Sequence, residues 1–258
     1  MMHLHLRARS LLLAAIAALA SGSGCIDSSQ KPLDYEAVAV TRAASSSGTA
    51  SSAMLGEWSV TLTRADIALG PFYFCAAASG SSTLCASSIA EVAHVSIVNA
   101  LAASSSPIGT VHGFSGTVQS VSYDFGISWF DTQIAATPAP ALPGGHSLRL
   151  EGEARKGTLR VPFTADVDVV PQYQGQNALS TASANAVVDS SATRLEVVLD
   201  PVRWLAQLDF DDVAQKLAAS GASSFAIAPG MPEHGAVLVG LKNLAPLQFR
   251  WVPAEAPR

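Results

Sequence analysis

The four histidines beyond residue 10 are the side chains whose chemistry is considered first. They are His94, His112, His146 and His234. Imidazole binds copper and zinc well, so a cluster of these residues could hold a metal ion. Metal sites often show close ligand spacing such as His-x-Glu-x-His, and the spacing here is far wider. Since three of the four lie next to a glycine, we expect loop or surface histidines and no cofactor, and we keep copper or zinc binding as an alternative.

A serine and a pair of carboxylates suggest two kinds of hydrolytic chemistry. The run Gly113-Phe114-Ser115-Gly116 resembles the start of a nucleophile elbow, which needs Gly-x-Ser-x-Gly on a turn from strand to helix. Residue 117 is Thr, and the segment after it has the pattern of a strand. Asp166 and Asp168 share one face of a predicted strand at about 7 Å, wider than the roughly 5 Å of a retaining glycosidase. We therefore expect no enzyme, with an envelope hydrolase as a minor alternative.

Two short aromatic runs could form a binding surface. They are Phe72-Tyr73-Phe74 and Trp129-Phe130. If they are exposed together, they form an apolar platform for a protein or glycan partner. If they are buried, they belong to the core of a β domain.

The chain contains three cysteines, which are Cys25, Cys75 and Cys85. An odd number of cysteines in an exported protein needs an explanation. If Cys25 is modified on its own, the other two cysteines remain as a pair. Cys75 and Cys85 enclose a short segment rich in Ala, Ser and Gly. We expect them to form a disulfide in an oxidising compartment, worth about 2–3 kcal/mol through loop closure.

The N-terminal segment has the order of charges and apolar residues that marks export. Arg7 and Arg9 precede an apolar run over residues 11–20, and small residues follow over 21–24. This order is typical of a secretory signal peptide. The apolar run is about half of the roughly 20 residues that a membrane-spanning helix needs.

The small residues before Cys25 resemble the lipobox of bacterial lipoproteins. The resemblance covers residues 1–25, and Gly22 stands where the lipobox usually has Leu. It implies that residues 1–24 are a cleaved signal peptide and that Cys25 becomes the lipidated N-terminus. Acyl chains would then hold the protein on a membrane of the cell envelope, at the outer membrane or the periplasmic face.

Composition restricts the remaining partners. Charged residues make up 14% of the chain, against about 25% in a typical soluble protein. The formal net charge is −5. No basic surface for nucleic acid is indicated, and no polybasic segment for anionic lipid.

Three regions follow the signal peptide. Residues 25–54 are rich in Ser and Ala and predict a flexible tether that can contain a short strand over 36–40. The alternative is that this segment supplies a first strand of the fold. Residues 55–253 predict a single β-rich globular domain. Residues 254–258 predict a loose tail.

Alternation of apolar and polar residues predicts many short strands in the domain. It starts at Trp58, and it predicts a hairpin in which 147–154 pairs with 159–170 across Lys156-Gly157. Pro162 indicates an edge position or a bulge, because proline lacks a donor. Segments 109–116 and 118–125 could pair with each other. Residues 87–102 fit either helix or strand.

Helix signals are confined to the later part of the chain. Asp200-Pro201 predicts a helix start, and a second helix is expected from residues 209–212 to Gly221. Residues 173–191 predict a surface loop. Strands are expected over 225–228, 236–241 and 247–252. The fold class is therefore mainly β, an antiparallel β-sandwich or barrel-like domain with one or two short helices late in the chain.

These observations together predict a non-enzymatic lipoprotein of the cell envelope that serves as a binding or structural module. The sequence leaves its ligand open, with a possible protein or glycan partner.

Overall fold

The computed structural model of the chain describes residues 30–42, 49–78, 88–128, 140–171 and 185–253. The chain divides into two units, residues 1–30 and 31–258, and the description below concerns the second. Cys25, Cys85, Trp129, Phe130 and the predicted tail lie outside the described residues. The described part is mainly β, as the sequence predicts. None of its helices is long and apolar enough to cross a bilayer.

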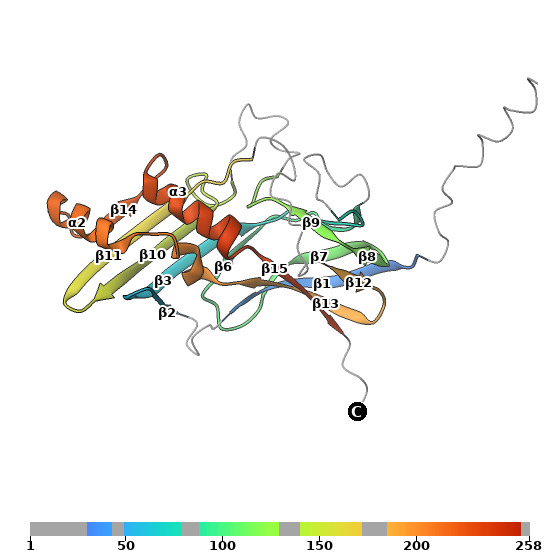
Figure 1. Cartoon of the computed structure of the whole chain (residues 1–258). Coiled ribbons are helices and arrows are strands. Elements are labelled where there is room, and N and C mark those ends of the chain that lie inside the picture. The colour runs from blue at the N-terminus through green and yellow to red at the C-terminus, as the bar shows by residue number, and fades with distance from the viewer. Residues whose placement is uncertain (1–29, 43–48, 79–87, 129–139, 172–184, 254–258) are drawn as a thin grey trace, which may run out of the picture. The chain divides into compact units, whose positions relative to one another are not determined.

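A seven-stranded sheet contains most of the early strands and the last one (Figure 1). In order across the sheet they are β15 (Gln248–Pro253), β13 (Ala192–Leu199), β1 (Pro32–Thr41), β7 (Ser106–Phe114), β5 (Ser88–Val92), β4 (Phe72–Cys75) and β9 (Ser120–Tyr123). Strands β1 and β13 run parallel, whereas their other neighbours in this sheet are antiparallel. The antiparallel prediction therefore holds for most pairs but not for all.

A second sheet has six strands. In order they are β14 (Phe225–Ile227), β11 (Leu159–Val167), β10 (Leu148–Lys156), β3 (Trp58–Leu69) and β2 (Ser51–Leu55), and β6 (Ser96–Asn99) pairs with the far end of β3. Two further strands, β8 (Gly116–Val118) and β12 (Ala186–Val188), form a small separate ladder. One hydrophobic core cluster contains buried residues of both large sheets.

The predicted hairpin is confirmed as β10 and β11, which pair along their full lengths. The alternation that predicts it places Val161, Phe163 and Ala165 in the core. Strand β14 pairs in parallel with β11 only over residues 163–165. Pro162 therefore lies just beyond the β14 pairing, where β10 is the strand that β11 pairs with, which agrees with the predicted edge position.

Four helical segments lie within the described residues 185–253. They are the 3₁₀ helix η2 (Pro201–Leu205), α2 (Phe210–Ser220), α3 (Pro232–Val239) and the π-helix η3 (Gly240–Leu244). Helix α2 packs on the sheet through Phe210, whose ring lies 5.8 Å from that of Trp58 and 5.7 Å from that of Phe163. Figure 1 shows α2 and α3 beside β10 and β11.

The predicted tether is wrong for two of its segments. Residues 32–41 form β1, a strand inside the seven-stranded sheet, and residues 51–55 form β2. Leu33, Tyr35, Ala37 and Ala39 alternate along β1 and belong to the hydrophobic core. The long-range pairing with β7 and β13 orders a segment whose local composition favours flexibility.

Several other local predictions need correction. Residues 236–241 belong to α3 and η3 rather than to a strand. Segments 109–116 and 118–125 do not pair, because β7 pairs with β1 and β5, β9 pairs with β4, and β8 pairs with β12. Within the predicted loop 173–191, residues 186–188 form β12. The ambiguous stretch 87–102 contains two strands, β5 and β6.

Candidate functional site

His146 is the histidine with the closest acidic partners. Its Nδ1 lies 2.6 Å from Oδ1 of Asp168, and its Nε2 lies 3.7 Å from Oδ2 of Asp166. Arg149 donates to Asp166 from Nε at 2.6 Å. This hydrogen bond to Arg149 lowers the pKa of Asp166 against the opposing effect of burial. The shared face of Asp166 and Asp168 is thus confirmed, and both carboxylates have partners there.

His234 reaches the same aspartate from a different element. It lies in α3, is buried, and its Nε2 accepts a hydrogen bond from the backbone N–H of Asp168 at 3.2 Å. Burial lowers the pKa of His234, whereas the charge of Asp168 raises it. Because Nε2 uses its lone pair as an acceptor, this nitrogen is occupied by the backbone and is not presented to a metal ion.

The other two histidines lie in different surroundings. His112 is exposed on β7, with Nδ1 at 3.8 Å from Oδ1 of Asp34. His94 follows β5 and is also exposed. Across the described residues, no group of three or more His, Cys, Asp and Glu side chains could hold a metal ion. The structure thus brings together only His146 and His234 of the four, around Asp168.

The remaining predicted site residues have mixed outcomes. Cys75 is fully buried on β4, and its pairing with Cys85 remains a prediction because Cys85 lies outside the described residues. Phe72 and Phe74 are fully buried, so the proposed aromatic platform is wrong for them. Their rings pack against Phe249 of β15. A strand follows Ser115, as expected. The Oγ atom of Ser115 accepts a hydrogen bond from the backbone N–H of Lys31.

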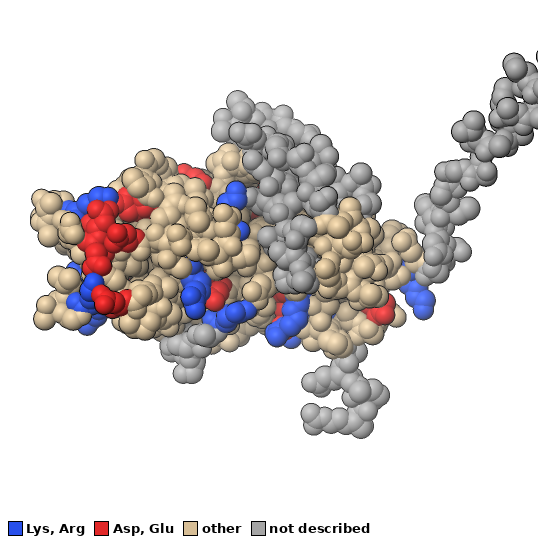
Figure 2. All heavy atoms as spheres, in the orientation of Figure 1, with Lys and Arg blue, Asp and Glu red and all other residues tan. Residues whose placement is uncertain are grey.

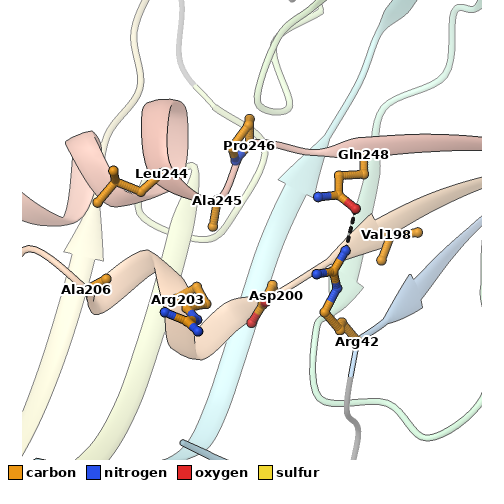
Figure 3. Close-up of a pocket in the computed structure, with 9 residues that line it drawn as sticks. All are labelled: Arg42, Val198, Asp200, Arg203, Ala206, Leu244, Ala245, Pro246 and Gln248. Atoms are coloured by element: carbon orange, nitrogen blue, oxygen red, sulfur yellow. Dashed lines mark hydrogen bonds between the residues drawn. The ribbon is translucent and has the colours of Figure 1, made fainter. Parts of the chain in front are cut away.

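A cavity of about 370 Å³ lies where β1 and β13 end and η2 begins (Figure 3). Its lining comes from three distant parts of the chain: Arg42; Val198, Asp200, Arg203 and Ala206; and Leu244, Ala245, Pro246 and Gln248. Figure 3 shows Asp200 between the side chains of Arg203 and Arg42. The segment that follows η3 forms the opposite wall.

A second cavity of about 520 Å³ continues the first across the sheet. It shares Arg42, Val198 and Gln248 with the first, and Val40, Thr41, Phe249 and Arg250 complete its lining. Val198 stands opposite Val40 on one side and Gln248 on the other, so these three side chains share one face of the sheet. We refer to the two adjoining cavities together as the arginine trough.

The charges of the trough differ in how far they are neutralised. Arg250 is paired with Glu196, which is 4% exposed and also receives a hydrogen bond from Arg194 at 2.7 Å. Arg42 donates to the side-chain carbonyl of Gln248, which is a neutral partner. The guanidinium of Arg203 has no hydrogen bond or ion pair within the described part of the chain. Two guanidinium charges, on Arg42 and Arg203, therefore remain available.

Local sequence explains how Asp200 and Arg203 come to face the trough. Asp200-Pro201 does start a helix, as predicted, but η2 is a single 3₁₀ turn and the Asp200 side chain makes no capping hydrogen bond. Pro201, Val202, Trp204 and Leu205 are buried, which leaves Arg203 on the exposed side of the turn. The Asp200 carboxylate therefore does not cap η2, and its oxygens can accept hydrogen bonds from a ligand.

Arg203 also separates the trough from a third cavity. That cavity, of about 370 Å³, is lined by residues of β2, the β2–β3 turn and the start of α2, together with Arg203 and Ala206. Figure 2 shows basic side chains spaced along the middle of the molecular face, and acidic ones gathered toward the end that carries α2. The sequence contains no local signal for the arginine trough, because the charged residues that line it are far apart in the chain.

Comparison of the chain with protein-family models, with curated proteins and with solved structures finds no match.

Proposed function

We propose that the chain is an exported, lipid-anchored binding protein of the cell envelope, and that the arginine trough is its ligand site. The observation that carries the binding role is the trough, in which the unpaired Arg203 guanidinium faces an apolar wall across a cavity of about 370 Å³. Cavities of about 300–1,000 Å³ with a few placed polar groups are typical of small-molecule sites.

The anchoring role rests on the N-terminal sequence. A signal-like segment ends at Cys25, and β1 starts at Pro32. Residues 26–31 lie between them, and six residues span at most about 20 Å when fully extended. The proposed anchor would therefore keep the folded body close to the membrane surface, and two or more acyl chains would make that attachment stable.

Anchoring is tested by expressing the full chain and a Cys25→Ala variant in a bacterial host. Mass spectrometry of the mature wild-type protein should find residue 25 as an acylated N-terminus, and the protein should partition into the detergent phase. The variant should lose both properties. A wild-type product with an unmodified Cys25 thiol would overturn this part of the proposal.

Binding is tested by equilibrium dialysis of the mature protein against a small-molecule extract of the host cells. Compounds retained by the wild type and lost from Arg203→Gln would be trough ligands. Lys242→Gln is the matched control, because Lys242 is an exposed cation in the neighbouring η3 and does not line the trough. If no compound depends on Arg203, the trough is not a ligand site.

A further inference from the structure

We infer that the arginine trough recognises an organic monoanion that carries a carboxylate, a neighbouring hydroxyl group, and a small apolar body. This inference rests on the proposed function and names its ligand class. The three recognition features correspond to three parts of the lining, which are the pair Arg42 and Arg203, the carboxylate of Asp200, and the apolar wall.

The first feature is the pair of guanidinium groups. A guanidinium presents a planar set of donors that matches a carboxylate, and such charge-assisted hydrogen bonds are stronger than neutral ones. Arg42 donates a hydrogen bond to the neutral side chain of Gln248, so its charge is not neutralised by that partner. Arg203 lies on the exposed side of η2 with no protein partner within the described residues. The two side chains lie on either side of Asp200 (Figure 3).

The second feature is Asp200, which restricts the charge of the ligand. With two arginines and one aspartate, this end of the trough carries a single net positive charge. A monoanion neutralises it, whereas a phosphate dianion would leave excess negative charge beside Asp200. The Asp200 side chain makes no capping hydrogen bond in η2 and can accept one from a ligand hydroxyl group.

The third feature is the apolar wall opposite the charges. Leu244 is 52% exposed, and Ala245 and Pro246 continue the wall beside it. Val198 and Ala206 also line the cavity. Burial of a small hydrocarbon group against these side chains adds affinity in proportion to the area covered.

The inference is tested by calorimetric titration of the mature protein with four probes. Mandelate has all three features, phenylacetate lacks the hydroxyl, mandelamide lacks the charge, and inorganic phosphate lacks the apolar body. We expect mandelate to bind most tightly and mandelamide to bind at least about tenfold more weakly, because a hydrogen bond to a charged group is lost.

Variants assign each feature to its residue. Arg203→Gln and Arg42→Gln should each weaken mandelate binding by about tenfold or more, and Lys242→Gln should leave it unchanged. Asp200→Ala removes both the charge and the acceptor, so it should abolish the preference for mandelate over phenylacetate and improve phosphate binding. Unchanged melting temperatures would show that the variants are folded.

Three results would overturn the inference. They are equal binding of mandelate and mandelamide, tighter binding of phosphate than of mandelate, and an absence of binding by every carboxylate probe at millimolar concentration. If dialysis nevertheless finds a compound whose retention depends on Arg203, the binding function stands and only the ligand class is wrong. If dialysis also finds none, both proposals fail.

Discussion

Gly240 lies directly against the backbone of Trp204. A β-carbon at Gly240 would meet the carbonyl oxygen of Trp204 and lie 2.7 Å from its carbonyl carbon. Trp204 is fully buried in η2, and Gly240 begins η3, so this contact joins two helical segments that each contribute a residue to the trough, Arg203 and Leu244. Glycine is required here by the close approach of two backbones.

Gly240→Ala should therefore destabilise the fold. The added methyl group meets backbone rather than a flexible side chain, so one helix must move, at a cost of about 1–3 kcal/mol. Chemical denaturation of the variant measures this loss directly. Gly235→Ala is the matched control, because nothing lies within 4 Å of a β-carbon in that position of α3. It should be neutral or stabilising by up to about 1 kcal/mol.

Asp209 should contribute to stability as the N-cap of α2. Its carboxylate accepts hydrogen bonds from the backbone N–H groups of Asp211 and Asp212 at 3.0 and 3.1 Å. Asp209→Ala removes both acceptor contacts and should cost about 1 kcal/mol in urea denaturation. Asp209→Asn keeps an acceptor oxygen, so its free energy of unfolding should decrease much less. Equal losses in the two variants would argue against capping.

Glu196 should make stability depend on pH in the acid range. Burial raises the pKa of this carboxyl, but hydrogen bonds from Arg250 and Arg194 outweigh it and leave the pKa below the ordinary 4.5. A carboxyl with a depressed pKa in the folded state adds stability above its unfolded pKa and loses it as the pH falls. Below pH 4.5, the free energy of unfolding should therefore decrease.

The variant Glu196→Gln should show a smaller decrease below that pH, because the amide does not titrate. Glu91→Gln, an exposed residue of β5, is the control and should follow the wild-type curve. Urea denaturation across this range measures both. Parallel curves for wild type and Glu196→Gln would contradict the prediction.

His234 should add a second pH dependence closer to neutrality. Burial lowers its pKa below the ordinary 6.5, so the unfolded chain takes up the proton more readily than the folded one. Stability should then fall as the pH drops below 6.5, and protonation also removes the acceptor for the Asp168 N–H. His234→Gln keeps an acceptor without a titration and should flatten this part of the stability curve. His94→Gln, which changes an exposed histidine, is the control and should leave the pH dependence of stability unchanged.

Cys75 and Cys85 should be linked in the exported protein. Peptide mapping of the mature protein without reductant should recover one cross-linked pair that separates on reduction. Cys75→Ala and Cys85→Ala should each remove the link and lower stability by about 2–3 kcal/mol if the loop-closure account holds. Recovery of both residues as separate alkylated peptides would show that the pair is not formed.

The sequence by itself determined the elements whose signals lie within a few residues. Alternation in 147–154 and 159–170 predicted β10 and β11, because a strand with one buried face must repeat every two residues. The sequence predicted a start of α2 at Asp209, Asp211 or Asp212, of which the structure selects Asp209 as the cap. Gly221 predicted the other end, since capping is a local event, and it takes the left-handed conformation expected of it. The mainly β class followed from the number of such short runs.

Only the tertiary structure decided which secondary structure the locally ambiguous segments adopt and which segments they pack against. Leu33, Tyr35 and Ala37 alternate with polar residues, a signal that the Ser- and Ala-rich surroundings hide, and β1 forms because β7 and β13 supply its hydrogen bonds. The apolar run in α3 fits a strand equally well, and packing against η2 and β11 makes it helical. The arginine trough has the same origin, because Arg42, Arg203 and Gln248 meet only when three distant segments fold together.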